Sequence, residues 1–142
     1  MQFIFSRVST KDLRGRTEAD VFVNVEAEFQ IADEDRTICS ESDFPVVELA
    51  AGLRMWKSSA DAVRSPFEFR SLSMEDRWVV RLLPIDTGWQ VVVDENGELV
   101  TGSTCSLAEV DIAIDNFADN LRATCVDLLG KWVERYLTEG FE

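Results

Sequence analysis

The first third of the chain carries the alternation of apolar and polar residues that is typical of β-strands. Residues 2–8 predict one strand, and residues 20–31 predict a second, in which valine, alanine, phenylalanine and isoleucine take every other position. A polar turn at 33–36 leads into a short third strand at 37–41. Because successive side chains of a strand point to opposite faces, we expect a sheet with one buried and one solvated face.

The spacing of apolar residues then changes to that of an amphipathic helix. Asp43 or a neighbouring residue is expected to cap this helix, Pro45 suits its first turn, and the pattern ends near Ser58. One side of the helix should be buried, because apolar residues recur there every three or four positions. This stripe contains Val46, Leu49, Ala50, Leu53 and Trp56.

A second block of β-structure follows the helix. Four strands are predicted at 66–73, 78–83, 89–94 and 99–102, with turns at 74–76, 86–88 and 96–97. The last turn is Asn96-Gly97, a pair that tolerates positive φ and therefore favours a tight hairpin. These short connections predict an antiparallel meander.

The C-terminal part predicts the longest helix. Ser106 and Glu109 fit the S-x-x-E capping box, and Gly130 is expected to mark a bend or the end of the helix. The helix carries one continuous apolar stripe. That stripe consists of Leu107, Val110, Ile114, Phe117, Leu121, Cys125, Leu128, Trp132 and Tyr136.

The order of these elements predicts an α+β fold. We expect an antiparallel β-sheet of about six to seven strands with two helices, the longer one C-terminal, packed on one face. Neither an internal repeat nor a low-complexity linker interrupts the 142 residues, so a single domain is expected over 1–142.

The net charge of the chain indicates which classes of partner it is suited to bind. There are 27 acidic residues against 14 lysines and arginines, a net charge of −13. Nucleic acids and anionic membranes both require a basic surface, so we expect neither as a partner. A basic protein is the natural partner class. The alternative is that the acidity only keeps the protein soluble.

The chain also lacks the marks of a secreted or membrane protein. Its apolar start, at residues 3–5, is too short for a signal peptide, and no apolar run is long enough for a membrane span. Cys39, Cys105 and Cys125 are odd in number and lack the spacing of metal ligands. We expect a cytoplasmic protein with reduced thiols and without a zinc site.

Catalytic motifs are weak in this sequence. The absence of histidine excludes Ser-His-Asp, Cys-His and histidine–metal arrangements. Residues 86–88, Asp-Thr-Gly, match the triplet of aspartic proteases, but a hairpin turn explains them better. The stretch from Asp94 to Gly97 resembles part of a calcium loop, yet Val92 and Ser103 would then occupy ligand positions that they cannot fill. We therefore expect no catalytic residues, no cofactor and no metal.

One acidic segment stands out within the chain. Between Leu82 and Leu121 there are eight acidic residues and neither lysine nor arginine. Like charges four residues apart destabilise a helix, so a repeat of aspartates at this spacing suggests a docking face for a cationic partner. A solvated face is the alternative. The residues predicted to bind the partner are Asp111, Asp115, Asp119, Glu95, Glu98 and Trp89, the last because it follows a turn and should be partly exposed.

Three short segments also carry a family resemblance. Residues 44–49 leading to Trp56, then 67–71 and 88–91, have a layout that resembles small acidic α+β immunity proteins of bacterial toxin systems. Such proteins bind and block a cognate toxin, often a basic nuclease, without catalytic residues of their own. The resemblance implies a non-enzymatic inhibitor. The alternatives are an oligomeric adaptor, including a homodimer, built on the long last helix, and a small-ligand-binding domain or carboxylate-dependent enzyme in the curved sheet.

Overall fold

The computed structural model describes residues 1–34, 36–59, 64–71 and 78–137 and shows an α+β fold. The predicted fold class is confirmed, and the described residues form seven strands in two antiparallel sheets. The first sheet has the order β1-β2-β3, with β1 Gln2–Ser9, β2 Glu26–Ala32 and β3 Thr37–Phe44. The second has the order β4-β5-β6-β7, with β4 Phe67–Phe69, β5 Trp78–Ile85, β6 Gly88–Glu95 and β7 Glu98–Thr101.

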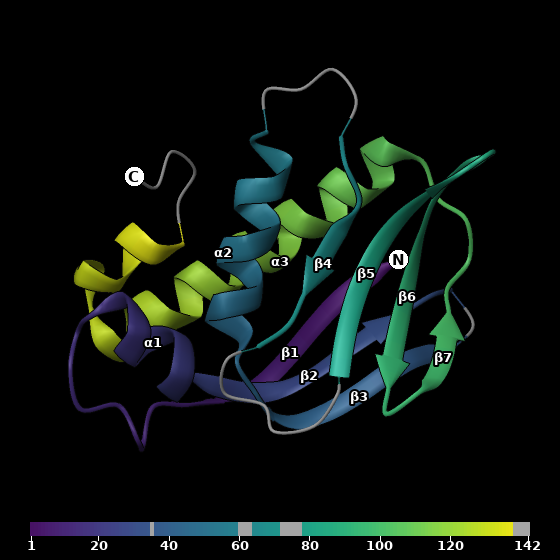
Figure 1. Cartoon of the computed structure of the whole chain (residues 1–142). Helices are drawn as coiled ribbons and strands as arrows, with labels where there is room; N and C mark the ends of the chain where they lie inside the picture. The colour runs from purple at the N-terminus through teal and green to yellow at the C-terminus, as the bar shows by residue number, and fades with distance from the viewer. Residues whose placement is uncertain (35, 60–63, 72–77, 138–142) are drawn as a thin grey trace.

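The helices cover the sheets from one side (Figure 1). They are α1 Glu18–Asn24, α2 Val46–Lys57, α3 Leu107–Leu129 and the short 3₁₀ helix η1 Lys131–Tyr136. α2 crosses α3, while α1 and η1 lie together at the C-terminal end of α3. The Tyr136 hydroxyl donates to the carbonyl oxygen of Arg16 at 2.6 Å and so ties η1 to the segment before α1. Among the described residues, no helix is both long enough and apolar enough to cross a membrane.

The prediction of one strand over 20–31 is wrong in its first half, which forms α1. Thr17 and Asp20 make a capping box: the Thr17 hydroxyl accepts from the Asp20 amide at 3.1 Å, and the Asp20 carboxylate accepts from the Thr17 amide at 3.2 Å. Val21 and Val25, both fully buried, also fit helical spacing. The alternating pattern was therefore ambiguous here, and the cap favours the helix.

The start of α2 also differs from the prediction. β3 continues to Phe44 instead of ending at 41, and Asp43 belongs to this strand with a φ of 53°. Pro45 takes the N-cap position, without a side-chain hydrogen bond, so Asp43 does not cap the helix. The predicted end near Ser58 is confirmed.

Two of the three predicted turns of the meander, at 86–88 and 96–97, are confirmed. Asn96 and Gly97 have φ angles of 53° and 93°, the left-handed conformation expected for a tight hairpin. The strand predicted at 66–73 is limited to Phe67–Phe69 in the described part; its last two positions, 72–73, and the predicted turn at 74–76 lie outside the described residues. At the end of α3, Gly130 has a φ of 105° and ends the helix, as predicted.

The core is an aromatic cluster that joins the two sheets and α3. Phe29 is fully buried, stacks on Phe44 with ring centroids 4.5 Å apart and lies 5.8 Å from Phe117 of α3. Phe44 in turn contacts Trp78 of the second sheet at 4.9 Å. Since aromatic side chains bury large areas, these contacts fix how both sheets sit against α3.

Candidate functional site

The acidic row on α3 pairs with basic residues at the end of α2. Arg54 lies between two of the aspartates, 2.6 Å from the carboxylate of Asp119 and 3.8 Å from that of Asp115. The Lys57 ammonium group approaches Asp115 at 3.1 Å. These ion pairs join the two helices and offset the repulsion between like charges along α3.

Asp111, the first aspartate of the row in the chain, is held by two hydrogen bonds from one arginine. Two guanidinium nitrogens of Arg64 donate to the two carboxylate oxygens of Asp111, at 2.5 and 2.9 Å. The same guanidinium group lies 4.9 Å from the ring centroid of Trp56, within cation–π range. The hydrogen bond to Asp111 raises the pKa of Arg64. Such a two-bond pair fixes orientation as well as charge.

The sequence therefore identified a real feature of α3, and the structure gives it an internal role. The basic side chains that meet the row belong to Arg54, Lys57 and Arg64, which precede the acidic segment in the chain. Arg54 and Lys57 are in the last turn of α2, where basic residues are usually explained by the helix dipole, so their pairing with a second helix carried no separate signal. The three aspartates remain partly exposed at their outer edges.

Glu95 and Glu98 lie together at the tip of the β6–β7 hairpin. They are directly opposite each other in the strand register, and both are exposed. Their neighbour Asp94 is used internally, because its carboxylate accepts from the Gly97 amide at 2.9 Å and lies 3.9 Å from Arg81. Figure 1 shows the turn between β6 and β7 at the lower end of these strands, whereas α3 begins at the upper end of the molecule, so the predicted site residues do not form one cluster.

Trp89 is buried, and its predicted partial exposure is wrong. Only 9% of the residue is exposed, and its ring meets Trp56 edge to face at 5.3 Å. Its backbone pairs with Cys105, the residue before the cap of α3, through N–H···O bonds of 2.8 and 2.9 Å. A tryptophan beside a turn was expected at the surface, but here its ring packs against Trp56 of α2.

The glycine of the Asp-Thr-Gly triplet and the three cysteines all have structural surroundings. Gly88 of the Asp-Thr-Gly triplet has a φ of 149°, and a Cβ there would lie 2.5 Å from the carbonyl oxygen of Cys105. Burial raises the pKa of the Cys39 and Cys125 thiols to about 12 and also raises that of Cys105. Among the described residues, no group of three or more potential metal ligands comes together.

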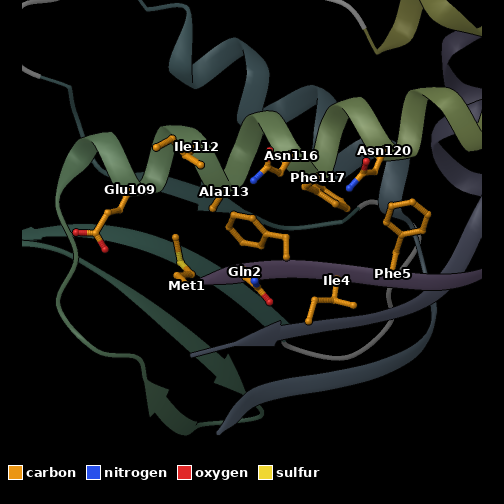
Figure 2. Close-up of a pocket in the computed structure, with 11 residues that line it drawn as sticks. Met1, Gln2, Ile4, Phe5, Glu109, Ile112, Ala113, Asn116, Phe117 and Asn120 are labelled. Carbon is orange, nitrogen blue, oxygen red and sulfur yellow. The ribbon is translucent and has the colours of Figure 1, made fainter. Parts of the chain in front are cut away.

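A groove that the sequence did not predict lies between β1 and α3 (Figure 2). Its volume is about 570 Å³. One wall is the strand from Met1 to Phe5, and the other is the side of α3 that faces away from the acidic row. The helix wall contains Glu109, Ile112, Ala113, Asn116, Phe117 and Asn120.

Fold and surface together define an α+β protein with an acidic hairpin and a groove at the edge of its first sheet. The model of a domain of unknown function, DUF7878, matches residues 1–125, and the chain belongs to this family. No curated protein and no solved structure matches the chain.

Proposed function

We propose that this chain is a non-enzymatic binding protein for a basic protein partner and that the tip of the β6–β7 hairpin is part of the contact surface. The observation that carries the proposal is the pair Glu95 and Glu98. Like charges directly opposite each other in a sheet destabilise it, by roughly 0.2–1 kcal/mol for a cross-strand pair. A cationic partner would turn this cost into a favourable interaction.

The surroundings of the hairpin support this assignment. Burial is the main cause of the raised pKa of the Cys39 thiol, and the carboxylates of Glu41 in β3 and Glu95 in β6 raise it further, so one acidic group from each sheet lies close enough to act on this residue. Leu99, next to Glu98, is 64% exposed. An exposed leucine beside carboxylates gives a partner apolar contact together with charge, the combination found at the core and rim of interfaces.

The non-catalytic part of the proposal has separate support. All three cysteines are buried with raised thiol pKa values, which makes them poor nucleophiles. The adaptor alternative is less favoured, because α3 buries the middle of its apolar stripe, from Val110 to Cys125, inside its own chain and leaves Leu128 as the exposed member. An inhibitor that neutralises a basic toxin is the more specific form of the proposal.

Affinity purification with paired variants tests the contact surface. C-terminally tagged wild type and the double variant E95Q/E98Q are applied to native extract at low salt, with D127N as the matched control for a lost exposed charge on α3. We expect wild type and D127N to recover the same basic protein, released by about 0.5 M NaCl, at which the Debye length is only about 4 Å. The double variant should recover several times less.

A second measurement separates the binding proposal from its inhibitor form. The recovered partner is purified, its association rate with each variant is measured, and its own activity is titrated with wild-type protein. Loss of activity at one equivalent supports the inhibitor form, whereas binding without loss of activity leaves only the binding proposal. Equal recovery by wild type and E95Q/E98Q, or recovery of no basic protein, would contradict the assignment of the hairpin.

A further inference from the structure

The first strand has an unpaired side. β1 is at the edge of its sheet, and among the described strands only β2 pairs with it. The pairing is regular from Gln2 to Ser6, and the register then shifts where Arg7 adopts a φ of 53°. Residues 2–6 therefore form a short, regular edge with backbone groups available for another strand.

The groove runs along this edge and not over one face of the sheet. Side chains of a strand alternate between its two faces, so a hollow on one face would touch every second residue. The groove is instead lined by five consecutive residues, Met1 to Phe5. Figure 2 shows α3 lying parallel to this stretch as the opposite wall.

This edge lacks the features that usually prevent strand addition. The segment 2–6 contains no charged residue and no proline, and Ile4 is 40% exposed. The opposite edge, β3, carries Glu41 and Asp43, while the two edges of the second sheet are only three and four residues long. Natural proteins protect edge strands by charge, proline, bulges or shortness. By this criterion β1 is the open edge of the described structure.

The helix wall offers matching polar groups. Asn116 and Asn120 are exposed, and Figure 2 shows their amide groups directed toward β1. Four residues of helix advance about 6.0 Å, close to the roughly 6.6 Å between alternate residues of a strand. Each side-chain amide can donate and accept, so the pair can meet successive outward-facing peptide groups of an extended chain. Ile112, 60% exposed, adds apolar surface one turn earlier.

Charge selects the kind of chain that would fit. Glu109 is at one end of the groove, and the adjoining hollow, which shares Met1 and Glu109, adds the carboxylates of Asp33 and Glu34 against two positive groups, Arg36 and the Met1 α-amino group. This end is therefore net negative. A second copy of the protein would bring another net charge of −13 to the same place, which disfavours self-pairing.

We propose that the edge of β1 and the facing wall of α3 bind an extended segment of a partner protein, which adds to the sheet as a further strand and places a lysine or arginine near Glu109. Backbone hydrogen bonds to residues 2–6 would supply much of the affinity, and alternate apolar side chains would select the segment. This site is separate from the acidic hairpin and does not depend on it.

Selection from a random-peptide display library tests this site. The bait is the full chain tagged at its C-terminus, so that β1 stays free. We expect enriched sequences to show apolar residues at every second position and one lysine or arginine, and to bind N116A/N120A about tenfold more weakly, a loss of about 1.4 kcal/mol. Alanine favours helix at exposed positions, so this variant should fold, which circular dichroism verifies.

Three controls make the result specific. D127A removes an exposed side chain of α3 outside the groove and should leave binding unchanged. E109Q retains the capping box, since glutamine can replace glutamate there, but should weaken peptides that carry a basic residue. Amide resonances of residues 2–6 should shift and become protected from exchange with a selected peptide. E95Q/E98Q should bind these peptides like wild type, which separates this site from the hairpin.

Several outcomes would overturn the proposal. These are the absence of enriched peptides, enrichment of a helical three-to-four spacing, and equal binding to wild type and N116A/N120A. Sedimentation of a stable dimer whose interface protects residues 2–6 would assign the groove to a second copy and would equally refute a partner segment.

Discussion

Arg64 and Asp111, 47 residues apart in the chain, form a two-bond ion pair at 2.5 and 2.9 Å that fastens the segment before β4 to the first turns of α3. Only 14% of the Arg64 side chain and 24% of the Asp111 side chain are exposed. Trp56 lies under the guanidinium group and donates its indole N–H to the Ser65 carbonyl oxygen at 2.8 Å. This network connects α2, the segment before β4 and α3.

Replacement of Asp111 by asparagine should lower the free energy of unfolding. The change removes one charge-assisted acceptor and leaves a partly buried guanidinium group without its partner, a loss of about 1–3 kcal/mol. Urea unfolding of D111N and wild type measures the difference. D127N, an exposed site on the same helix, should change it by less than about 0.5 kcal/mol. Equal effects at both sites would show that the ion pair contributes nothing specific.

Gly88 should not tolerate alanine. A Cβ at this position would lie 2.5 Å from the Cys105 carbonyl oxygen, and the φ of 149° is one that side chains rarely adopt. We expect G88A to lose more than about 1 kcal/mol and to weaken the pairing of Trp89 with Cys105. G52A is the matched control. Gly52 is in the middle of α2 with ordinary contacts to Phe67, so alanine should stabilise by about 0.5–1 kcal/mol. Thermal unfolding should therefore give a lower melting temperature for G88A and a higher one for G52A than for wild type.

The cysteine thiols should react only when the protein unfolds. Burial raises the pKa of Cys39 and Cys125 to about 12, whereas a free thiol titrates near 8.5, so the thiolate fraction near pH 8 falls by about three orders of magnitude. Alkylation by iodoacetamide, followed by mass spectrometry, should be slow in native protein and fast in urea. Rapid labelling of the native protein would contradict this burial.

Glu26 should make stability depend on pH. Burial raises its pKa above 4.5, and nearby Asp43 and Asp12 raise it further. The folded state therefore binds a proton more tightly than the unfolded state, and the ionised side chain costs stability at neutral pH. We expect E26Q to be more stable than wild type near pH 7, with a difference that shrinks as the pH falls through the folded pKa toward 4.5. A constant difference across this range, measured by urea unfolding, would contradict the assignment.

Local signals in the sequence predicted most of the elements. The capping box of Ser106 and Glu109, the turn at 96–97 and the stop at Gly130 all depend on interactions within a few residues, and all are confirmed. The error at α1 is also local in origin, because Val21 and Val25 fit both periodicities and only the capping box of Thr17 and Asp20 distinguishes the helix from a strand. A local pattern predicts an element reliably where the residues fit only one kind of secondary structure.

The candidate sites depended on contacts that local patterns do not contain. The sequence by itself determined the α+β class, the excess of acidic charge, the absence of histidine chemistry and the acidic row of α3. Only the tertiary structure showed that the row meets Arg54, Lys57 and Arg64, that Trp89 is covered and that β1 has an open edge beside α3. The reason is physical: charge and periodicity belong to residues and their near neighbours, whereas pairing and exposure depend on the packing of segments as far as 120 residues apart.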